Sequence, residues 1–198
     1  GQVGLAMMLL VGSGLMIRSF AQLRNVDPGF RTEQALTFRL YLPPSEAADW
    51  KAVQRFYENL EDRLRALPGV EAVGAVDNIP IDSGKSNSAL LVEDRPPAPG
   101  ALPDIVRTVR TDAGYFEAIG IPRLEGRVFE AAELREPSRV AVVSRALAAK
   151  FWPGQSALGK RVAVGLDLEK RMDWAEVVGV VGDVHDTALD QPGDAMVY

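Results

Sequence analysis

The stretch Ser138–Val164, SRVAVVSRALAAKFWPGQSALGKRVAV, decides how the fold is organised. Its β-branched run at Arg139–Val143 predicts a strand. Ser144 follows at the position of a helix N-cap, where a hydroxyl accepts a hydrogen bond from a first-turn N–H. Leu147 and Phe151 give the short helix an apolar side. The stretch contains no catalytic pattern and predicts half of an α/β domain.

The end of the same stretch leads into the last strands. Pro153-Gly154 stops the helix, because Pro lacks an N–H and disfavours helical geometry in the residue before it. Arg161–Leu166 then predicts a strand that pairs with Trp174–Val184 across the charged turn at 167–173. The nearly continuous valines of the second strand are typical of a strand buried on both faces.

An earlier part of the chain shows a similar order of elements. Leu36–Leu42 alternates apolar and polar residues, which predicts a strand with one buried face. Ser45 is the expected cap of the next helix, which Pro68-Gly69 ends, and Val70–Val76 predicts a second strand. The pattern indicates a β-α-β unit. The apolar positions of the helix recur at spacings of three and four: Val53, Phe56, Tyr57, Leu60, Leu64 and Leu67.

The middle of the chain has a different character. Asn78–Ser88 is rich in residues that favour turns, so we place a boundary there. Ala89–Glu93 and Ile105–Val109 predict a hairpin whose loop, Arg95–Pro103, is exposed and has polyproline character. This loop is either a partner contact or a solvated hairpin tip. A short helix capped by Asp112 and a strand at Ile121–Phe129 complete the section.

These elements predict an α+β fold. Two β-α-β halves flanking an insertion suggest a split β-α-β, ferredoxin-like layer with helices on one side and a small inserted β-rich lobe. The expected parts are the end of a membrane helix with a juxtamembrane helix (1–24), a first half (25–77), the inserted lobe (78–136) and a second half (137–198).

The first segment is abnormal for a soluble chain. Val3–Ile17 carries no charge but is shorter than the ~20 apolar residues that span a membrane. We interpret it as the end of a transmembrane helix, because it lacks the polar face of an amphipathic core helix. A signal peptide and a buried core helix are the alternatives; the first lacks a basic region before the apolar run. The residues expected to be embedded in the membrane are Leu5, Met8, Leu9, Leu10, Leu15 and Ile17.

Composition limits the function classes. The hydrophobic content of 47% and charged content of 25% are ordinary for a folded protein. A formal net charge of -5 argues against nucleic acid as a partner, since a basic face supplies most of that affinity. The absence of cysteine from the sequence excludes disulfides, thiolate zinc sites and cysteine nucleophiles.

No chemical motif stands out. Gly179 and Gly182 bracket two valines but open no phosphate-binding loop, so we interpret them as strand glycines. His185 is the single histidine; with Asp183 and Asp186 it would form only a weak cation site. No Gly-x-Ser-x-Gly elbow surrounds a serine. Trp152 and Trp174 fit core or lobe-interface packing better than a ligand platform. We therefore expect no catalytic residue, no metal site and no cofactor.

Several segments carry a resemblance to a known family. They are LLVGSGLMIRSFAQLRNVDPGF (9–30), TDAGYFEAIGIPRLEGRVF (111–129), AVVSRALAAKFWPGQSALGKRV (141–162) and WAEVVGVVGDVHD (174–186). Together they resemble the periplasmic core domain of MacB-type, FtsX-like ABC transporter permeases, in particular orphan permeases that carry the domain twice. At Ser144-Arg145 the family more often has Asn and an acidic residue, which concerns the cap and not the function.

The resemblance implies a porter-like α/β layer with an inserted sabre-like lobe, held on the periplasmic or extracellular side of the cytoplasmic (inner) membrane. It also implies a cytoplasmic ATPase subunit or domain, a periplasmic adaptor, the lipid bilayer and a dimeric assembly as partners. The expected function is non-enzymatic: to transmit ATP-driven motion and to contact a partner or an export substrate. The alternative is a membrane-anchored binding module that handles lipoproteins or regulates a separate envelope machine.

Overall fold

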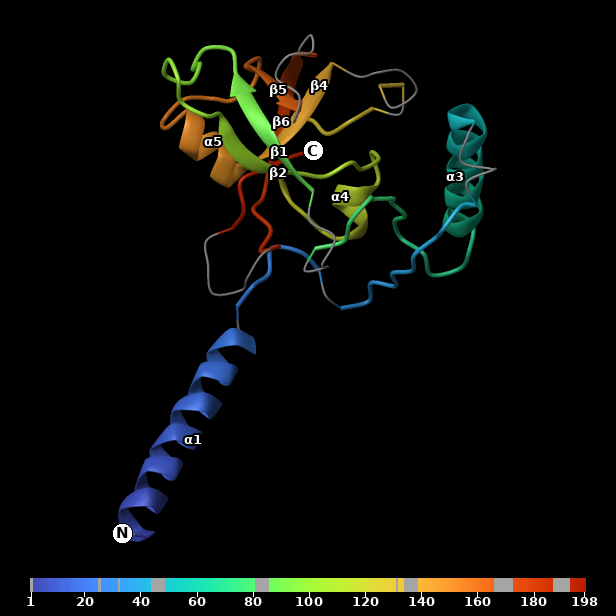
Figure 1. Ribbon diagram of the computed structural model, residues 1–198. Helices are drawn as coiled ribbons and strands as arrows, with labels where there is room; N and C mark the ends of the chain where they lie inside the picture. The colour runs from blue at the N-terminus through green and yellow to red at the C-terminus, as the bar shows by residue number, and fades with distance from the viewer. Residues whose placement is uncertain are drawn as a thin grey trace.

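The computed structural model describes residues 2–24, 26–31, 33–43, 49–80, 86–130, 132–133, 139–165, 173–186 and 193–198. The chain folds into a sheet-based body from which one long helix projects (Figure 1). The helices are α1 (Gln2–Arg24), α3 (Trp50–Arg65), α4 (Tyr115–Ala118) and α5 (Arg145–Phe151). The strands are β1 (Asn87–Val92), β2 (Asp104–Thr108), β3 (Arg123–Gly126), β4 (Val140–Ser144), β5 (Arg161–Gly165), β6 (Ala175–Val181) and β7 (Met196–Val197).

The strands of the described chain form one sheet that closes on itself. Their order is β3-β6-β4-β7-β2-β1-β5, and β5 also pairs with β6. The start of β6 pairs with β5, whereas its end pairs with β3. The pairs β4–β6 and β2–β7 are parallel, and the other pairs are antiparallel. Closure leaves few unpaired strand edges, which makes the body a compact unit.

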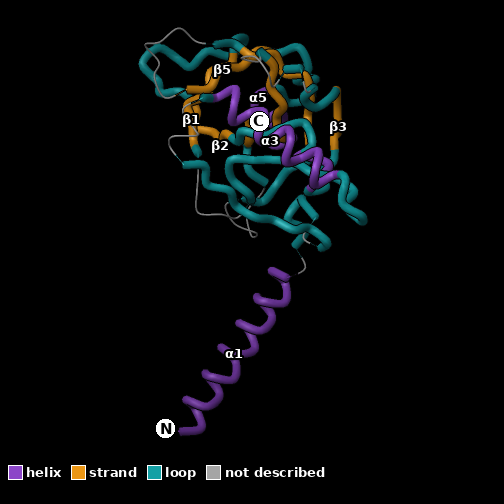
Figure 2. Tube along the Cα trace, turned by 90° about the vertical axis from the view of Figure 1, so that its right-hand side faces the viewer, coloured by secondary structure: helices purple, strands orange, loops and turns teal. Residues whose placement is uncertain are grey.

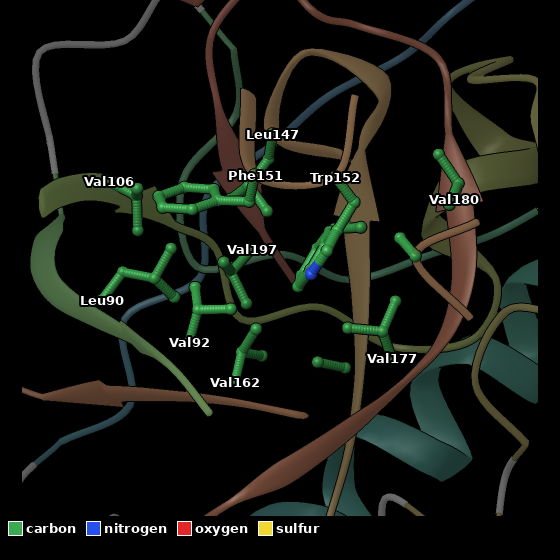
Figure 3. Close-up of a cluster of buried hydrophobic side chains, with 13 residues drawn as sticks. Leu90, Val92, Val106, Leu147, Phe151, Trp152, Val162, Val177, Val180 and Val197 are labelled. Atoms are coloured by element: carbon green, nitrogen blue, oxygen red, sulfur yellow. The ribbon is translucent and has the colours of Figure 1, made fainter. Parts of the chain in front are cut away.

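The main hydrophobic core lies inside the ring of strands. The helix α5 directs Leu147 and Phe151 into this space, and Trp152 follows directly after the helix (Figure 3). Only 1% of Trp152 is exposed. Valines and a leucine from β1, β2, β4, β5, β6 and β7 surround these three side chains. Ser144 caps α5 as expected: its Oγ accepts the Leu147 N–H at 3.3 Å.

A second core lies on the outer face of the same strands. Val142 and Val181 belong to it, whereas their neighbours Val143 and Val180 belong to the inner core. Successive residues of a strand point to opposite faces, so β4 and β6 are buried on both sides as their valines predicted. The helix α4 covers the outer face with Tyr115 and Phe116.

Two glycines, one in β6 and one just after it, allow the chain around β3 to pack closely against β6. The register between β4 and β6 shifts so that Val178 is passed over, which is a β-bulge. A Cβ on Gly179 would lie 1.9 Å from the carbonyl oxygen of Arg127, and one on Gly182 would lie 2.9 Å from Cγ of Pro122. Gly179 in β6 and Gly182 just after it therefore allow neighbouring backbone segments to pack closely against them.

Two of the expected strands are absent from the described chain. Leu36–Leu42 has no regular secondary structure and pairs with no described strand. Val70–Val76 makes only an isolated bridge, between Val76 and Thr111. These two strand predictions were wrong because alternation indicates a face that can be buried, whereas a strand also needs a neighbour for its backbone hydrogen bonds. The helix between them, α3, begins at its cap Asp49, whose carboxylate accepts the Lys51 N–H.

The remaining predictions have mixed outcomes. The α+β class, the hairpin β1–β2 with its exposed loop and the β5–β6 pair are confirmed. Trp174 is half-buried, with the Arg161 guanidinium 5.9 Å from the ring centroid. Strands of the predicted inserted lobe and of the predicted second half belong to one sheet. The division of the chain at 24, 77 and 136 stays a prediction, and Ser45 and the turn at 167–173 lie mostly outside the described residues.

Candidate functional site at the helix–body junction

The chain that follows α1 is fastened to the body by backbone contacts. Asp27 Oδ1 accepts the Gly29 N–H at 2.9 Å, which shapes a tight turn. The Pro28 carbonyl then accepts the His185 N–H at 2.9 Å, and the Arg31 N–H donates to the Ile119 carbonyl at 2.6 Å. Phe30 packs against the outer core. The turn thus belongs to the body by contact, although it follows the projecting helix in sequence.

Gly29 is the point of closest approach. Its φ of +83° is a backbone conformation that favours glycine, and a Cβ there would lie 1.9 Å from the carbonyl oxygen of Asp183. Asp183 lies just after β6, the strand that pairs with both β4 and β5 and so closes the ring of strands. The backbone of the turn is therefore in close contact with the segment that directly follows β6.

Asp183 links this contact to α5. Its Oδ1 accepts the Ala146 N–H at 2.6 Å, and its Oδ2 accepts Arg145 Nε at 2.9 Å. Gly193 passes so close that a Cβ there would lie 2.4 Å from the Asp183 Cβ. The Asp183 carboxylate, considered with His185 and Asp186 as a weak cation site, thus has hydrogen-bond donors on both oxygens.

A buried ion pair lies beside the junction. Arg107 on β2 pairs with Asp186, and their exposed fractions are 7% and 4%. The Arg107 N–H donates to the Ala195 carbonyl at 3.2 Å, and the Asp186 N–H donates to Asp194 Oδ2 at 3.0 Å. Burying two charges is expensive unless they are paired, so this pair ties the segment after β6 to the far side of the ring.

A small hollow, partly open to solvent, borders this ion pair. Tyr115 and Tyr198 line it together with Arg107, Asp186 and Asn78. Burial is the main cause that raises the pKa of both tyrosines above the ordinary range, and the nearby carboxylates add to it. Both phenols are therefore neutral at physiological pH and offer no nucleophile or base there.

The side chains that could have formed a hydrolytic site have other contacts. The Ser144 hydroxyl donates to the Asp194 carbonyl at 3.0 Å and accepts the N–H groups of Leu147 and Met196. His185 Nδ1 is buried and has no hydrogen-bond partner among the described residues, so nothing there orients the ring as a general base. Within the described ranges no group of three or more His, Asp or Glu residues could hold a metal ion.

The helix α1 carries the residues that were expected in the membrane. Within the described chain it is the one helix that is long and apolar enough to span a bilayer, over Gln2–Ala21 with a mean hydropathy of 1.7. Twenty residues of helix are ~30 Å long, which matches the hydrocarbon core. Met8, Leu9, Leu10, Leu15 and Ile17 are between 63% and 75% exposed. Leu5 belongs to the helix, but its side chain lies outside the described part; membrane insertion of the six stays a prediction.

Residues 3–198 match the family described as the MacB-like periplasmic core domain. The chain belongs to this family. Its members are periplasmic domains of MacB-like ABC transporter permeases, so the family resemblance predicted from the sequence is confirmed. No curated protein matches the chain.

Solved structures are similar to this MacB-like periplasmic core domain. They include the extracellular domain of the noncanonic ABC-type transporter YknZ from Gram-positive bacteria (19% identity, TM-score 0.46, 71% of this chain and 60% of that one). The periplasmic region of MacB from Actinobacillus actinomycetemcomitans has 16% identity and a TM-score of 0.46, over 70% and 60% of the two chains. A domain of a putative permease protein from Porphyromonas gingivalis has 21% identity and a TM-score of 0.40, over 66% and 46%. The matched region is thus about 60% of the first two chains.

The junction residues of this MacB-like periplasmic core domain were only partly visible in the sequence. The sequence Asp27-Pro28-Gly29 is typical of a turn, but it does not predict docking on Asp183 and His185. Gly29 was the one signal, and it was ambiguous. A glycine after Pro fits either a free turn or a close approach to another backbone segment. Arg107 gave no signal, since an arginine in an alternating strand reads as an exposed position.

Proposed function

We propose that this chain is the non-catalytic, extracytoplasmic part of an ABC-type permease of the cytoplasmic (inner) membrane, and that it passes ATP-driven motion of α1 to the folded body. In this function α1 crosses the bilayer, with Leu5, Met8, Leu9, Leu10, Leu15 and Ile17 embedded in it. The body relays force without making or breaking covalent bonds.

The observation that carries the proposal is the docking of residues 26–31. A flexible tether would let α1 move without the body. Here the Pro28 carbonyl accepts a backbone hydrogen bond, the Arg31 N–H donates one, and the contact of Gly29 with Asp183 fastens the turn further. The helix points away from the sheet in both views (Figures 1 and 2). A long projecting helix joined to a compact body through a fastened turn suits a lever.

Contact with a partner or an export substrate is the second part of the proposal. Leu36, Phe38 and Tyr41 are 90%, 58% and 81% exposed, and none of the described apolar side chains of α3 is fully buried. Exposed apolar surface of this extent is typical of an interaction site. The partners that fit are a cytoplasmic ATPase acting through the membrane helices, a periplasmic adaptor and a second permease subunit.

The test uses the full permease with its ATPase in membranes. The sequence contains no cysteine, so single cysteines can carry spin labels without a background. One pair, Ala21→Cys and Glu117→Cys, reports the distance between the end of α1 and the body. The Glu117→Cys label alone reports the height of the body above the bilayer, because a paramagnetic lipid headgroup relaxes the label more strongly at shorter distance. We expect ATP with vanadate to change the height and to leave the pair distance unchanged.

The matched variants are Gly29→Ala and Gly69→Ala. Both positions have a positive φ, +83° and +84°, but a Cβ on Gly69 would meet no atom within 4 Å. Gly29→Ala should therefore broaden the pair distance and weaken the response to ATP, whereas Gly69→Ala should retain both. A body whose height does not respond to ATP would refute transmission. Co-purification with a lipoprotein or a wall hydrolase and no ATPase would favour the binding-module alternative instead.

A further inference from the structure

An exposed apolar segment lies between the turn at 26–31 and α3. Leu36, Phe38, Leu40 and Tyr41 are 90%, 58%, 38% and 81% exposed. Residues 36–42 pair with no described strand, so the sheet does not cover these side chains. Large apolar side chains that gather at the surface within a few residues mark a contact with a partner or a membrane.

The position of this segment favours the membrane. In Figure 1 the chain that follows α1 runs below the sheet on its way to α3, on the side of the body from which α1 leaves. The hydrogen bonds of the Pro28 carbonyl and the Arg31 N–H fix the start of this path on the body. When α1 crosses the bilayer over Gln2–Ala21, the membrane surface lies just beyond Ala21 and faces the segment.

The residue types of the segment also suit the boundary between lipid and water. Tyrosine is enriched at this boundary, because its ring is apolar and its hydroxyl is polar. The Arg39 Nη1 donates to the Tyr41 hydroxyl at 3.3 Å, so the polar ends of these two side chains meet. An arginine can bury its aliphatic stem while its guanidinium group stays among the headgroups. The segment thus offers apolar side chains to the lipid and a polar pair to the headgroups.

The local charge is favourable as well. The whole chain has a formal net charge of -5, but residues 18–41 carry four arginines against two acidic residues. This stretch is therefore positively charged, and anionic headgroups attract such a stretch when it lies near the membrane surface. The charged residues are Arg18, Arg24, Arg31 and Arg39, with Asp27 and Glu33.

We propose that residues 36–41 rest on the bilayer surface and form a second contact between the body and the membrane. Leu36, Phe38 and Leu40 enter the boundary between headgroups and acyl chains, while Arg39 and Tyr41 stay at the headgroups. This inference rests on the proposed function, because it requires α1 to cross the bilayer, and it names lipid as what the segment meets. Two contacts fix the orientation of the body over the membrane, which a single helix does not.

Spin labels on single cysteines test the proposal in the full permease, reconstituted into vesicles of phosphatidylethanolamine and phosphatidylglycerol. The labelled variants are Leu36→Cys and Phe38→Cys. The matched control is Leu102→Cys, which is also an exposed leucine, at 89%, in the loop between β1 and β2 on the side of the sheet away from α1 (Figure 1). Power saturation compares collisions with oxygen, which concentrates in lipid, and with a nickel chelate, which stays in water. We expect a higher oxygen-to-nickel ratio at the first two positions than at Leu102→Cys.

The outcomes separate this proposal from the proposed function. A Leu36→Cys label as accessible to nickel as Leu102→Cys would overturn the membrane contact, and so would a label shielded from both reagents, which indicates a protein partner. Leu10→Cys, in the middle of α1, should be accessible to oxygen. If nickel reaches Leu10→Cys, α1 is outside the bilayer and the proposed function itself fails.

A second measurement does not depend on labels in the segment. The double variant Leu36→Asp and Phe38→Asp places two carboxylates where the apolar side chains would meet lipid. It should increase the height that the Glu117→Cys label reports, because the body loses its second contact with the membrane. Leu102→Asp should leave that height unchanged. A double variant with an unaltered height would contradict the proposal.

Discussion

The helices α5 and α3 have the same signals in sequence and opposite environments in the structure. Each has a side-chain cap, an apolar stripe and a Pro-Gly pair after its end. The shorter helix, α5, buries Leu147 completely, whereas the longer α3 leaves Phe56 43% exposed. An apolar stripe indicates which face of a helix can be buried. Whether that face is buried depends on the strands that surround the helix.

The strands before the two helices differ in the same way. Val140–Ser144 lies between β6 and β7 in the sheet, so its backbone groups are paired on both sides. Leu36–Leu42 has a clearer alternation but no paired neighbour among the described residues. The body therefore carries most of the stability, and the region around α3 is the part whose apolar side chains stay accessible. The predictions below test this contrast.

The largest difference is expected between Trp152→Ala and Phe56→Ala. Trp152 is 1% exposed inside the ring, so its truncation should lower the free energy of unfolding by ~3–5 kcal/mol. Phe56 is 43% exposed on α3 and should cost less than ~1 kcal/mol. Urea unfolding followed by circular dichroism measures both. Equal losses would show that α3 belongs to the same cooperative core as α5.

A smaller difference is expected between the two N-caps. Ser144→Ala removes the acceptor of the Leu147 N–H and of the Met196 N–H inside the core, and should cost ~2 kcal/mol. Asp49→Ala removes the acceptor of the Lys51 and Ala52 N–H groups at the surface. It should fray α3 at a cost of ~1 kcal/mol or less. Hydrogen exchange should show the second loss in α3 alone; loss of protection in the sheet would contradict the contrast.

The smallest change in stability is expected for Arg65→Leu. The pairs of Arg65 with Glu61 and Asp62 lie on a 45% exposed side chain, so their loss should change stability by ~0.5 kcal/mol or less. Arg65 lowers the pKa of Glu61, so its removal should raise that pKa further. The titration of the Glu61 carboxyl carbon resonance measures this change. A Glu61 pKa that falls in the variant would contradict the pairing of Arg65 with Glu61.

Local features of the fold could be predicted from the sequence. The cap at Ser144 and the helix end before Pro153 depend on near neighbours in the chain, and these were confirmed. Closure of the sheet was not visible, because it depends on pairs such as Leu90 with Val164 that are distant in sequence. A single sequence gives the period of each strand but not the identity of its partner.

The candidate site was less visible than the fold for the same reason. Gly29 has the pattern of a turn glycine, and Asp183 lies at the end of the predicted strand Trp174–Val184. Their contact depends on where residues 26–31 lie relative to β6. The candidate membrane helix α1 was the exception, since the absence of charge from Val3–Ile17 is a property of a continuous segment.

The fastening of residues 26–31 also bears on how this body can be grafted onto other proteins. A fusion that replaces α1 with a different anchor should retain everything from Val26 onward, because the Pro28 carbonyl and Gly29 complete the surface around Asp183 and His185. A splice placed after Arg31 would leave the His185 N–H without its acceptor and open the outer core beside Phe30. The boundary useful to a protein engineer is therefore the end of the helix and not the start of the first strand.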